Sequence, residues 1–296
     1  LCVSIPLVDS HLTGSGLTLN VVRPSDTSSN ASLPVVVVSL RALRSGVRSL
    51  PLGFYGGGFQ YGSAVQYDNM STTIVQRSVD LGQPLIFVSM NYRTSAFGFL
   101  PGQEVHDAGV GNIGLQDREL SQNISPQAKL TPFSERSALQ WVKNFIPSFG
   151  GNSSHVILWG QSAGAISASL QMLAYNGSTS GLFHGAFLQS GSPIPVGTLT
   201  EGQVYYNQLV NATSCSLQSD TLACLRRVDL GILSRAINDS PGIFAYQSLV
   251  LAWTPRADGS FLSDNPQRLV QQNRVANIPF VSGDVDDEGT IFSQST

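Results

Sequence analysis

The hydrophobic positions of the chain form short strand-like runs that alternate with helical stretches. Six runs of four to six residues are rich in β-branched, leucine or aromatic side chains, as buried strands are: 17–22, 34–38, 85–90, 156–159, 185–189 and 278–282. Apolar residues recur at helical spacing in residues 137–145, and residues 165–173 are rich in alanine and leucine. This alternation predicts an α/β fold with a mostly parallel central sheet and helices on both of its faces.

The pattern changes after about residue 200. Residues 201–271 are mainly helical with polar loops, and they precede the last strand-like run. We therefore expect a helical excursion inserted into the sheet order. The chain has no internal repeat and no low-complexity segment, and we interpret residues 1–296 as a single domain.

Composition narrows the class of protein. The 296 residues are 42% hydrophobic, which is enough apolar material for a globular core. A net charge of -3, from 16 basic and 19 acidic residues, leaves no basic stripe for nucleic acid and no polybasic anchor for a membrane surface. No apolar run approaches the roughly 18 to 20 residues needed to cross a bilayer. These features favour a small-molecule or apolar partner, without nucleic acid or a transmembrane segment, and leave the oligomeric state open.

Two features predict a secreted protein. The chain contains seven Asn-x-Ser/Thr sequons, at Asn30, Asn69, Asn123, Asn152, Asn176, Asn211 and Asn238. Cys215 and Cys224 lie nine positions apart, close enough for a local disulfide in an oxidising compartment; the alternative is two reduced thiols in a cytosolic core. The chain begins at Leu1 without a charged and apolar leader, so a signal peptide is either removed or not included.

The strongest chemical signal is the pentapeptide Gly160-Gln161-Ser162-Ala163-Gly164, between a predicted strand and a predicted helix. A Gly-x-Ser-x-Gly turn joins strand to helix so sharply that the serine hydroxyl is exposed beyond the carboxyl edge of the sheet. The serine also lies at a helix N-terminus, where amide dipoles favour negative charge. A Gly/Ser-rich turn matches this pattern by chance, but the strand-turn-helix context predicts that Ser162 is a nucleophile.

A second signal is the run Gly56-Gly57-Gly58-Phe59, upstream of Ser162. Esterases with such a nucleophile use a glycine run to aim backbone amides at the oxyanion of a tetrahedral intermediate. Glycine allows this turn without placing a side chain in the cavity. A flexible glycine turn is the alternative, but the downstream nucleophile motif favours an oxyanion loop.

A third signal is the acidic segment 283–290, directly after the last predicted strand. The acid of a Ser, Asp/Glu, His triad lies in such a loop, and Glu288 is the candidate. Asp284, Asp286 and Glu288 also alternate as in a calcium loop. However, the fifth loop position is Glu288 and the twelfth is Ser295, where a calcium loop needs Asp or Asn and then a bidentate Glu. The pattern therefore argues against calcium, and no metal or organic cofactor is implied.

With these motifs, the chain resembles the type-B carboxylesterases, which are α/β-hydrolases and include fungal lipases, sterol esterases and cholinesterases. It looks most like the secreted fungal members. The stretches that carry the resemblance run through most of the chain: 17–21, 55–59, 91–93, 111–117, 160–165, 189–193 and 287–290.

The resemblance implies a serine carboxylic-ester hydrolase that acts on a small-molecule or lipid ester through an acyl-enzyme intermediate. The site residues that it implies are Ser162 as acyl carrier, Glu288 as triad acid, and the amides of Gly57, Gly58 and Ala163 as the oxyanion hole. It also implies that Cys215 and Cys224 are bonded.

The chain departs from this family in two ways, which concern the catalytic histidine and the two ends of the domain. The catalytic histidine of the family lies well downstream of the acid, and none of His11, His106, His155 and His184 fits that place. The N-terminal strands of the family are not recognisable either, so we expect a partial domain, truncated at both ends. Without an imidazole to accept the Ser162 proton, the chain alone is expected to be nearly inert.

Two segments, about 39–51 and 119–135, separate stretches that follow each other closely in the family. We interpret them as non-family insertions of the kind that translated introns produce; surface loops are the alternative. Two further interpretations of the whole chain are a catalytically silent cholinesterase-like binding or adhesion domain and a truncated gene model.

Overall fold

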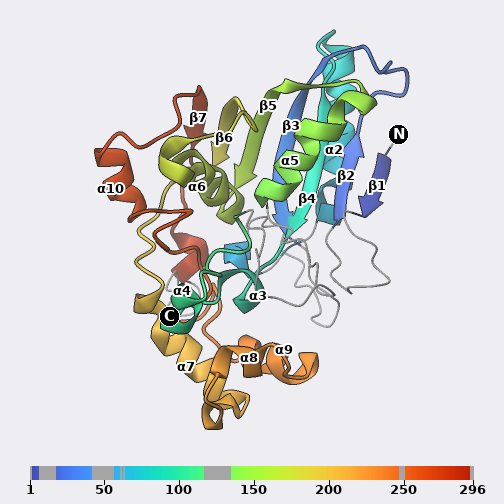
Figure 1. Cartoon of the computed structure of the whole chain (residues 1–296). Helices are drawn as coiled ribbons and strands as arrows, with labels where there is room; N and C mark the ends of the chain where they lie inside the picture. The colour runs from blue at the N-terminus through green and yellow to red at the C-terminus, as the bar shows by residue number, and fades with distance from the viewer. Residues whose placement is uncertain are drawn as a thin grey trace.

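A seven-stranded sheet packed between helices dominates the molecule (Figure 1). The structure is a computed structural model. It describes residues 2–6, 18–41, 57–60, 62, 64–116, 135–246 and 251–293.

The strands lie in the order β1-β2-β4-β3-β5-β6-β7. Their bounds are β1 (Cys2–Pro6), β2 (Thr18–Val22), β3 (Leu33–Arg41), β4 (Ile86–Tyr92), β5 (Gly151–Gln161), β6 (Gly185–Gln189) and β7 (Phe280–Gly283). Strands β1 and β2 pair antiparallel, as do β2 and β4. All pairs from β4 through β3, β5 and β6 to β7 are parallel. Parallel neighbours need crossover connections, and the described helices that precede β7 lie in the connections between successive strands.

The two faces of the sheet pack against different helices because side chains alternate along each strand. In β3, Val35 belongs to the buried cluster that includes α5 (Glu135–Phe145) and α6 (Ala163–Gly177). Val38 belongs instead to the cluster that includes α2 (Asp68–Asp80). Both faces of β3 are therefore covered, which explains why its sequence is a nearly continuous apolar run.

Shorter helices complete the fold. They are η1 (Gly57–Phe59), η2 (Ala64–Tyr67), α3 (Ala96–Phe99), α4 (Gln103–Asp107), η3 (Ile146–Phe149), η4 (Thr200–Gly202), α7 (Gln203–Ala212), η5 (Cys215–Leu217), α8 (Thr221–Leu225), α9 (Leu230–Asn238), α10 (Pro266–Gln271) and η6 (Thr290–Ser293). Helices α7, α8 and α9 gather below the sheet, at the bottom of Figure 1, and form the helical excursion expected after residue 200. Within the described ranges, no helix is both long and apolar enough to span a bilayer.

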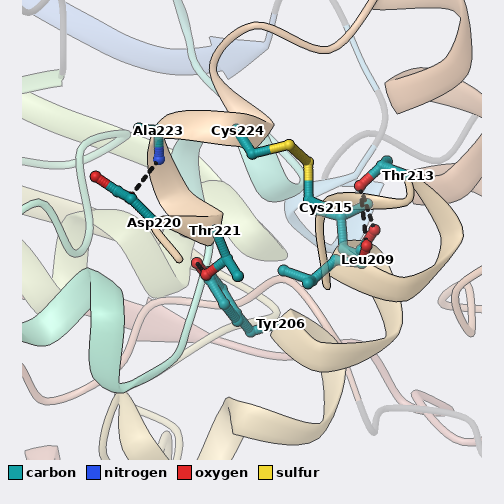
Figure 2. Close-up of a disulfide and its surroundings, with 9 residues drawn as sticks. Tyr206, Leu209, Thr213, Cys215, Asp220, Thr221, Ala223 and Cys224 are labelled. Atoms are coloured by element: carbon teal, nitrogen blue, oxygen red, sulfur yellow. Dashed lines mark hydrogen bonds between the residues drawn. A yellow bond between two sulfur atoms is a disulfide. The ribbon is translucent and has the colours of Figure 1, made fainter. Parts of the chain in front are cut away.

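A disulfide joins two parts of this helical excursion (Figure 2). The sulfur atoms of Cys215 and Cys224 are 2.06 Å apart, and their Cα atoms are 5.7 Å apart. Beside it, the hydroxyls of Tyr206 and Thr221 are hydrogen-bonded at 2.7 Å, and Asp220 caps α8 by accepting a backbone hydrogen bond at 2.8 Å. A bond of this kind typically stabilises a domain by about 2–4 kcal/mol.

The elements predicted from the hydrophobic pattern are confirmed, several with longer bounds. Strand β3 continues to Arg41, and β5 begins at Gly151. Cys2–Pro6, which the sequence pattern assigned to no strand, forms β1. One expectation is wrong: the run 278–282 was expected to be a buried strand, but all four residues of β7 are exposed. The reason is that β7 is the last strand of the described sheet and pairs with β6 alone.

The two suspected insertions fall mostly outside the described residues, which exclude 42–56 and 117–134. Of the remainder, residues 39–41 belong to β3, and Glu135 begins α5.

Candidate active site

Ser162 lies at the junction of β5 and α6, as the pentapeptide predicts. Its φ of 53° and ψ of −122° lie outside the regions that L-residues ordinarily occupy. Two backbone hydrogen bonds hold this conformation: the Ser162 N–H donates to the Gln189 carbonyl at 2.9 Å, and the Ile166 N–H donates to the Ser162 carbonyl at 2.9 Å. A half-buried serine in such a turn presents its hydroxyl at the carboxyl end of a central strand.

The sharpness of this turn requires glycine at position 160. A Cβ there would lie 2.2 Å from the carbonyl carbon and oxygen of Gly164, and 2.4 Å from the Ala165 nitrogen. These atoms belong to the first turn of α6, so the helix packs directly on the strand backbone. A side chain at position 160 would push the helix, and Ser162 with it, away from the sheet.

The glycine run forms a left-handed turn. The φ angles of Gly57, Gly58 and Phe59 are 61°, 53° and 62°, and the Gln60 N–H donates to the Gly57 carbonyl at 2.7 Å. This conformation suits glycine but costs a residue such as Phe59 about 1–2 kcal/mol. The turn is therefore maintained by its surroundings.

Burial of Phe59 supplies part of that support. Its ring is fully buried and meets the Phe99 ring edge-on, with centroids 5.2 Å apart. The Ser95 N–H donates to the Phe59 carbonyl at 2.9 Å. The turn also lies against α6, and Phe59 shares a buried cluster with Ala163, the first residue of that helix. The structure thus brings the glycine run and the serine turn together across about 100 residues of sequence.

The acidic loop follows β7, which pairs with β6. Strand β6 ends at Gln189, whose carbonyl accepts the Ser162 N–H. The Ser190 N–H, at the end of β6, donates to the Gly283 carbonyl of β7 at 2.8 Å. Ser190 follows Gln189, whose carbonyl accepts the Ser162 N–H, so the serine turn and the acidic loop lie at the same edge of the sheet. Glu288 itself is exposed, and its Oε1 accepts the Val285 N–H at 3.0 Å.

The Asp287 carboxylate stabilises the same loop through hydrogen bonds. Its Oδ1 accepts the backbone N–H groups of Gly289 at 3.1 Å and Thr290 at 3.0 Å, and the Thr290 hydroxyl donates to its other carboxylate oxygen. The Thr290 hydroxyl, with help from these amides, holds the pKa of Asp287 below its ordinary value. Asp287 therefore stays ionised and organises the turn around Glu288. No three His, Cys, Asp or Glu side chains in the described ranges cluster closely enough to hold a metal ion.

None of the described histidines is placed to act as the base that accepts the Ser162 proton. His184 immediately precedes β6, and His155 lies in the amino-terminal half of β5, so both are near the edge of the sheet opposite Ser162. His106 lies in α4 and pairs with Asp107 at 3.1 Å. None of these three rings is hydrogen-bonded to Ser162. His11 lies outside the described residues.

The structure also contains a buried polar cluster that the sequence did not indicate. The Asp258 Oδ2 accepts from the side-chain amides of Asn112 at 3.0 Å and Gln116 at 2.8 Å. Its Oδ1 accepts the backbone N–H groups of Ser260 and Leu262, each at 3.0 Å. Burial, opposed in part by these bonds, raises the pKa of the Asp258 carboxyl. The stretch 111–117 carries part of the family resemblance, but nothing in the sequence pairs it with a carboxylate 142 positions after Gln116.

The strand order and the serine turn after β5 define an α/β-hydrolase fold. The crystal structure of Aspergillus niger EstA matches it with a TM-score of 0.67 and 30% sequence identity, over 90% of this chain and 45% of that chain. The chain belongs to the carboxylesterase family, which it matches over residues 12–123 and 130–296.

Fungal lipases are similar to the chain in sequence. Secreted lipase 1 of Botryotinia fuckeliana is 38% identical over 283 residues, which cover 94% of this chain and 43% of that protein. Lipase 2 of Diutina rugosa is 37% identical over 288 residues, which cover 95% of this chain and 46% of that protein. The chain thus spans less than half the length of these relatives.

Proposed function

We propose that this chain carries the nucleophile, oxyanion hole and triad acid of a serine carboxylic-ester hydrolase. The Ser162 Oγ attacks the acyl carbon, and the alcohol leaves with a proton, so that an acyl-serine ester remains. Water then attacks this ester and releases the carboxylic acid and free Ser162. The observation that carries the proposal is the strained backbone of Ser162 between β5 and α6, which is bonded to Gln189 of β6 and Ile166 of α6. Such a turn leaves the serine hydroxyl at the carboxyl end of β5.

The other roles follow from the neighbouring segments. The amides of Gly57, Gly58 and Ala163 donate to the oxyanion, because the glycine turn lies against the helix that Ala163 begins. Glu288 orients a histidine that accepts the serine proton. All four histidines of the chain precede Glu288, whereas the triad order of this fold is Ser, acid, His. We therefore infer that the base comes from outside these residues and that the 296-residue chain alone is nearly inert.

The substrate class is a carboxylic ester, either a small molecule or a lipid. Membership of the carboxylesterase family and the similarity to proteins named as lipases support this assignment.

A fluorophosphonate probe tests the nucleophile. The protein expressed from its complete gene should be labelled and should hydrolyse a p-nitrophenyl ester, and Ser162→Ala should abolish labelling and lower hydrolysis by about a thousandfold or more. Ser153→Ala is a matched control on the opposite end of β5 and should behave as the wild type. If the wild-type protein is neither labelled nor active, that result favours the alternative of a catalytically silent binding domain.

We also propose that the protein is a secreted glycoprotein. The disulfide suits an oxidising compartment, and two relatives are named a secreted lipase and a secreted triacylglycerol lipase. The described sequons with exposed asparagines are Asn30, Asn69, Asn176, Asn211 and Asn238. Enzymatic deglycosylation of protein from the culture medium should lower its mass; an unchanged mass would show that the sequons are unused.

For segments 39–51 and 119–135, we keep the interpretation of non-family insertions. The family match omits residues 124–129, inside the second segment, which supports the interpretation there. Transcript reads that pass continuously through both segments and their flanks in mature message would reject it.

A further inference from the structure

The side chain of Gln60 joins the glycine turn to a distant segment of the chain. Its Nε2 donates to the Pro241 carbonyl at 3.2 Å, and its Oε1 accepts the Ile243 N–H at 3.1 Å. Gln60 is 5% exposed, so both of its polar atoms are satisfied inside the protein. A buried amide that makes both bonds fixes two backbones relative to each other, because losing either bond leaves a buried polar group unpaired.

The same segment packs directly on Gly58. A Cβ at Gly58 would lie 2.6 Å from the Ile243 Cδ1, so the Ile243 side chain occupies the space that the glycine leaves free. Ile243 is itself buried. The segment therefore holds the turn twice, through the Gln60 hydrogen bonds and through the contact with Gly58.

A buried hydrogen bond fixes the position of the segment that contains Pro241 and Ile243. The Trp253 indole N–H donates to the Ser240 hydroxyl at 2.7 Å, and Trp253 is 2% exposed. Ser240 immediately precedes Pro241, whose carbonyl accepts from Gln60. The Gln60 side chain is thus anchored to a fixed point and not to a freely moving loop.

The segment also touches η6, the short helix that follows the acidic loop. The ring of Phe244 stacks on the ring of Phe292, with centroids 6.4 Å apart and an angle of 21° between their planes. Phe292 lies in η6, which follows Glu288 by two residues. Residues 241–244 consequently contact both the glycine turn and the short helix that follows the proposed acid.

We propose that Gln60 is a positioning residue for ester hydrolysis, which rests on the function proposed above. It ties the Gly57–Gly58 turn to residues 241–243, so that the oxyanion amides keep a fixed orientation while the acyl carbon becomes tetrahedral. Gln60 does not touch the reacting atoms; it acts through the backbone of the turn. Oxyanion donors stabilise the transition state more than the ground state, so their misplacement lowers kcat and leaves KM nearly unchanged.

Gln60→Met tests the proposal because methionine has a similar length and shape but makes neither hydrogen bond. In the protein expressed from its complete gene, we expect kcat to fall about tenfold or more, since small displacements of catalytic groups lower rates strongly. KM should stay within about twofold. Gln203→Met is the matched control, because the Gln203 side chain makes the same two kinds of hydrogen bond but joins α7 to α4. Its Nε2 donates to the Glu104 Oε2 at 2.9 Å, and its Oε1 accepts the Gln103 N–H at 2.6 Å. Its kcat and KM should equal those of the wild type.

Hydrogen exchange gives a readout that does not depend on activity. Peptides covering residues 57–60 and 241–246 should exchange about fivefold or more faster in Gln60→Met than in the wild type, and Gln203→Met should leave both unchanged. If Gln60→Met does not fold, Ile243→Val keeps both Gln60 bonds, removes one methyl from the contact with Gly58, and should raise exchange in the same two peptides.

The outcomes separate the two proposals. Unchanged kcat, or a raised KM with kcat intact, overturns the positioning role while the activity of the wild type stands. Unchanged exchange overturns the tie between the two segments. A wild-type protein without hydrolysis overturns the proposed function, and the exchange measurement still decides whether Gln60 joins the segments.

Discussion

The serine turn and the acidic loop follow strands of the same sheet, yet they are held in different ways. Ser162 follows β5, a strand with neighbours on both sides, and its helix packs directly on the strand at Gly160. Glu288 follows β7, whose residues are all exposed, and its loop is held by hydrogen bonds within residues 283–290. The proposed nucleophile is therefore fixed by packing of the whole fold, and the proposed acid by a short local turn.

The difference has a physical consequence for substitutions. Close packing makes the serine turn sensitive to single atoms, because surrounding backbone cannot move without disturbing the sheet. In an exposed loop, a new side chain extends into solvent and disturbs local bonds at most, so the loss of stability is small. Matched changes in the two regions should give very different losses of stability.

The largest contrast is expected between two glycine-to-alanine changes. Gly160→Ala places a Cβ 2.2 Å from Gly164 atoms and should lower the free energy of unfolding by about 3 kcal/mol or more, with loss of Ser162 labelling. Gly283→Ala meets nothing within 4 Å and should change stability by less than about 0.5 kcal/mol. Urea unfolding of both variants measures the contrast; equal losses would contradict it.

A second contrast uses valines on the two strands. Val156 on β5 is 0% exposed and Val281 on β7 is 58% exposed. Val156→Ala should cost about 2 kcal/mol through lost burial and a residual cavity, and Val281→Ala less than about 0.5 kcal/mol. Thermal unfolding at matched protein concentration checks both. A large loss for Val281→Ala would mean that β7 is covered in the folded protein.

A smaller effect is expected from a side-chain bond that joins the strand ends beside Ser162. The Trp159 Nε1 donates to the Gln189 Oε1 at 2.8 Å. Trp159→Phe keeps an aromatic ring beside Phe187 but loses this bond, and should cost about 1 kcal/mol. Gln189→Met removes the acceptor instead; a double-mutant cycle should give a coupling energy, and strict additivity would show that the bond contributes nothing.

The smallest effect concerns the exposed acidic loop and its dependence on pH. The lowered pKa of Asp287 means that its stabilising bonds are present above the ordinary value of 3.8 and are lost as the pH falls through the lowered pKa. Carboxyl carbon NMR should give a titration midpoint for Asp287 below 3.8. Thr290→Ala should move that midpoint back toward the ordinary value, because the Thr290 hydroxyl is the largest cause. An unmoved midpoint would assign the shift to the amides alone.

Local signals in the sequence predicted most of the sheet and the serine turn. The runs of valine, isoleucine and leucine marked β3 to β6 because a buried strand needs little more than its own apolar residues. Gly160 and Ser162 stood out because a strand-to-helix turn of this sharpness permits few residues at these positions. The predicted bounds were short where polar residues such as Gln161 continue a strand through backbone pairing.

Tertiary structure alone decided the contacts between distant segments. The sequence by itself determined the α/β pattern, the serine turn and the glycine turn, since each depends on the conformations that neighbouring residues allow. The bonds from Gln60 to Pro241 and Ile243, the bonds from Asp258 to Asn112 and Gln116, and the exposure of β7 depend on which segments the fold brings together. Side-chain amides and carboxylates carry no sequence period that marks their partners, and whether a strand is covered depends on its place in the sheet.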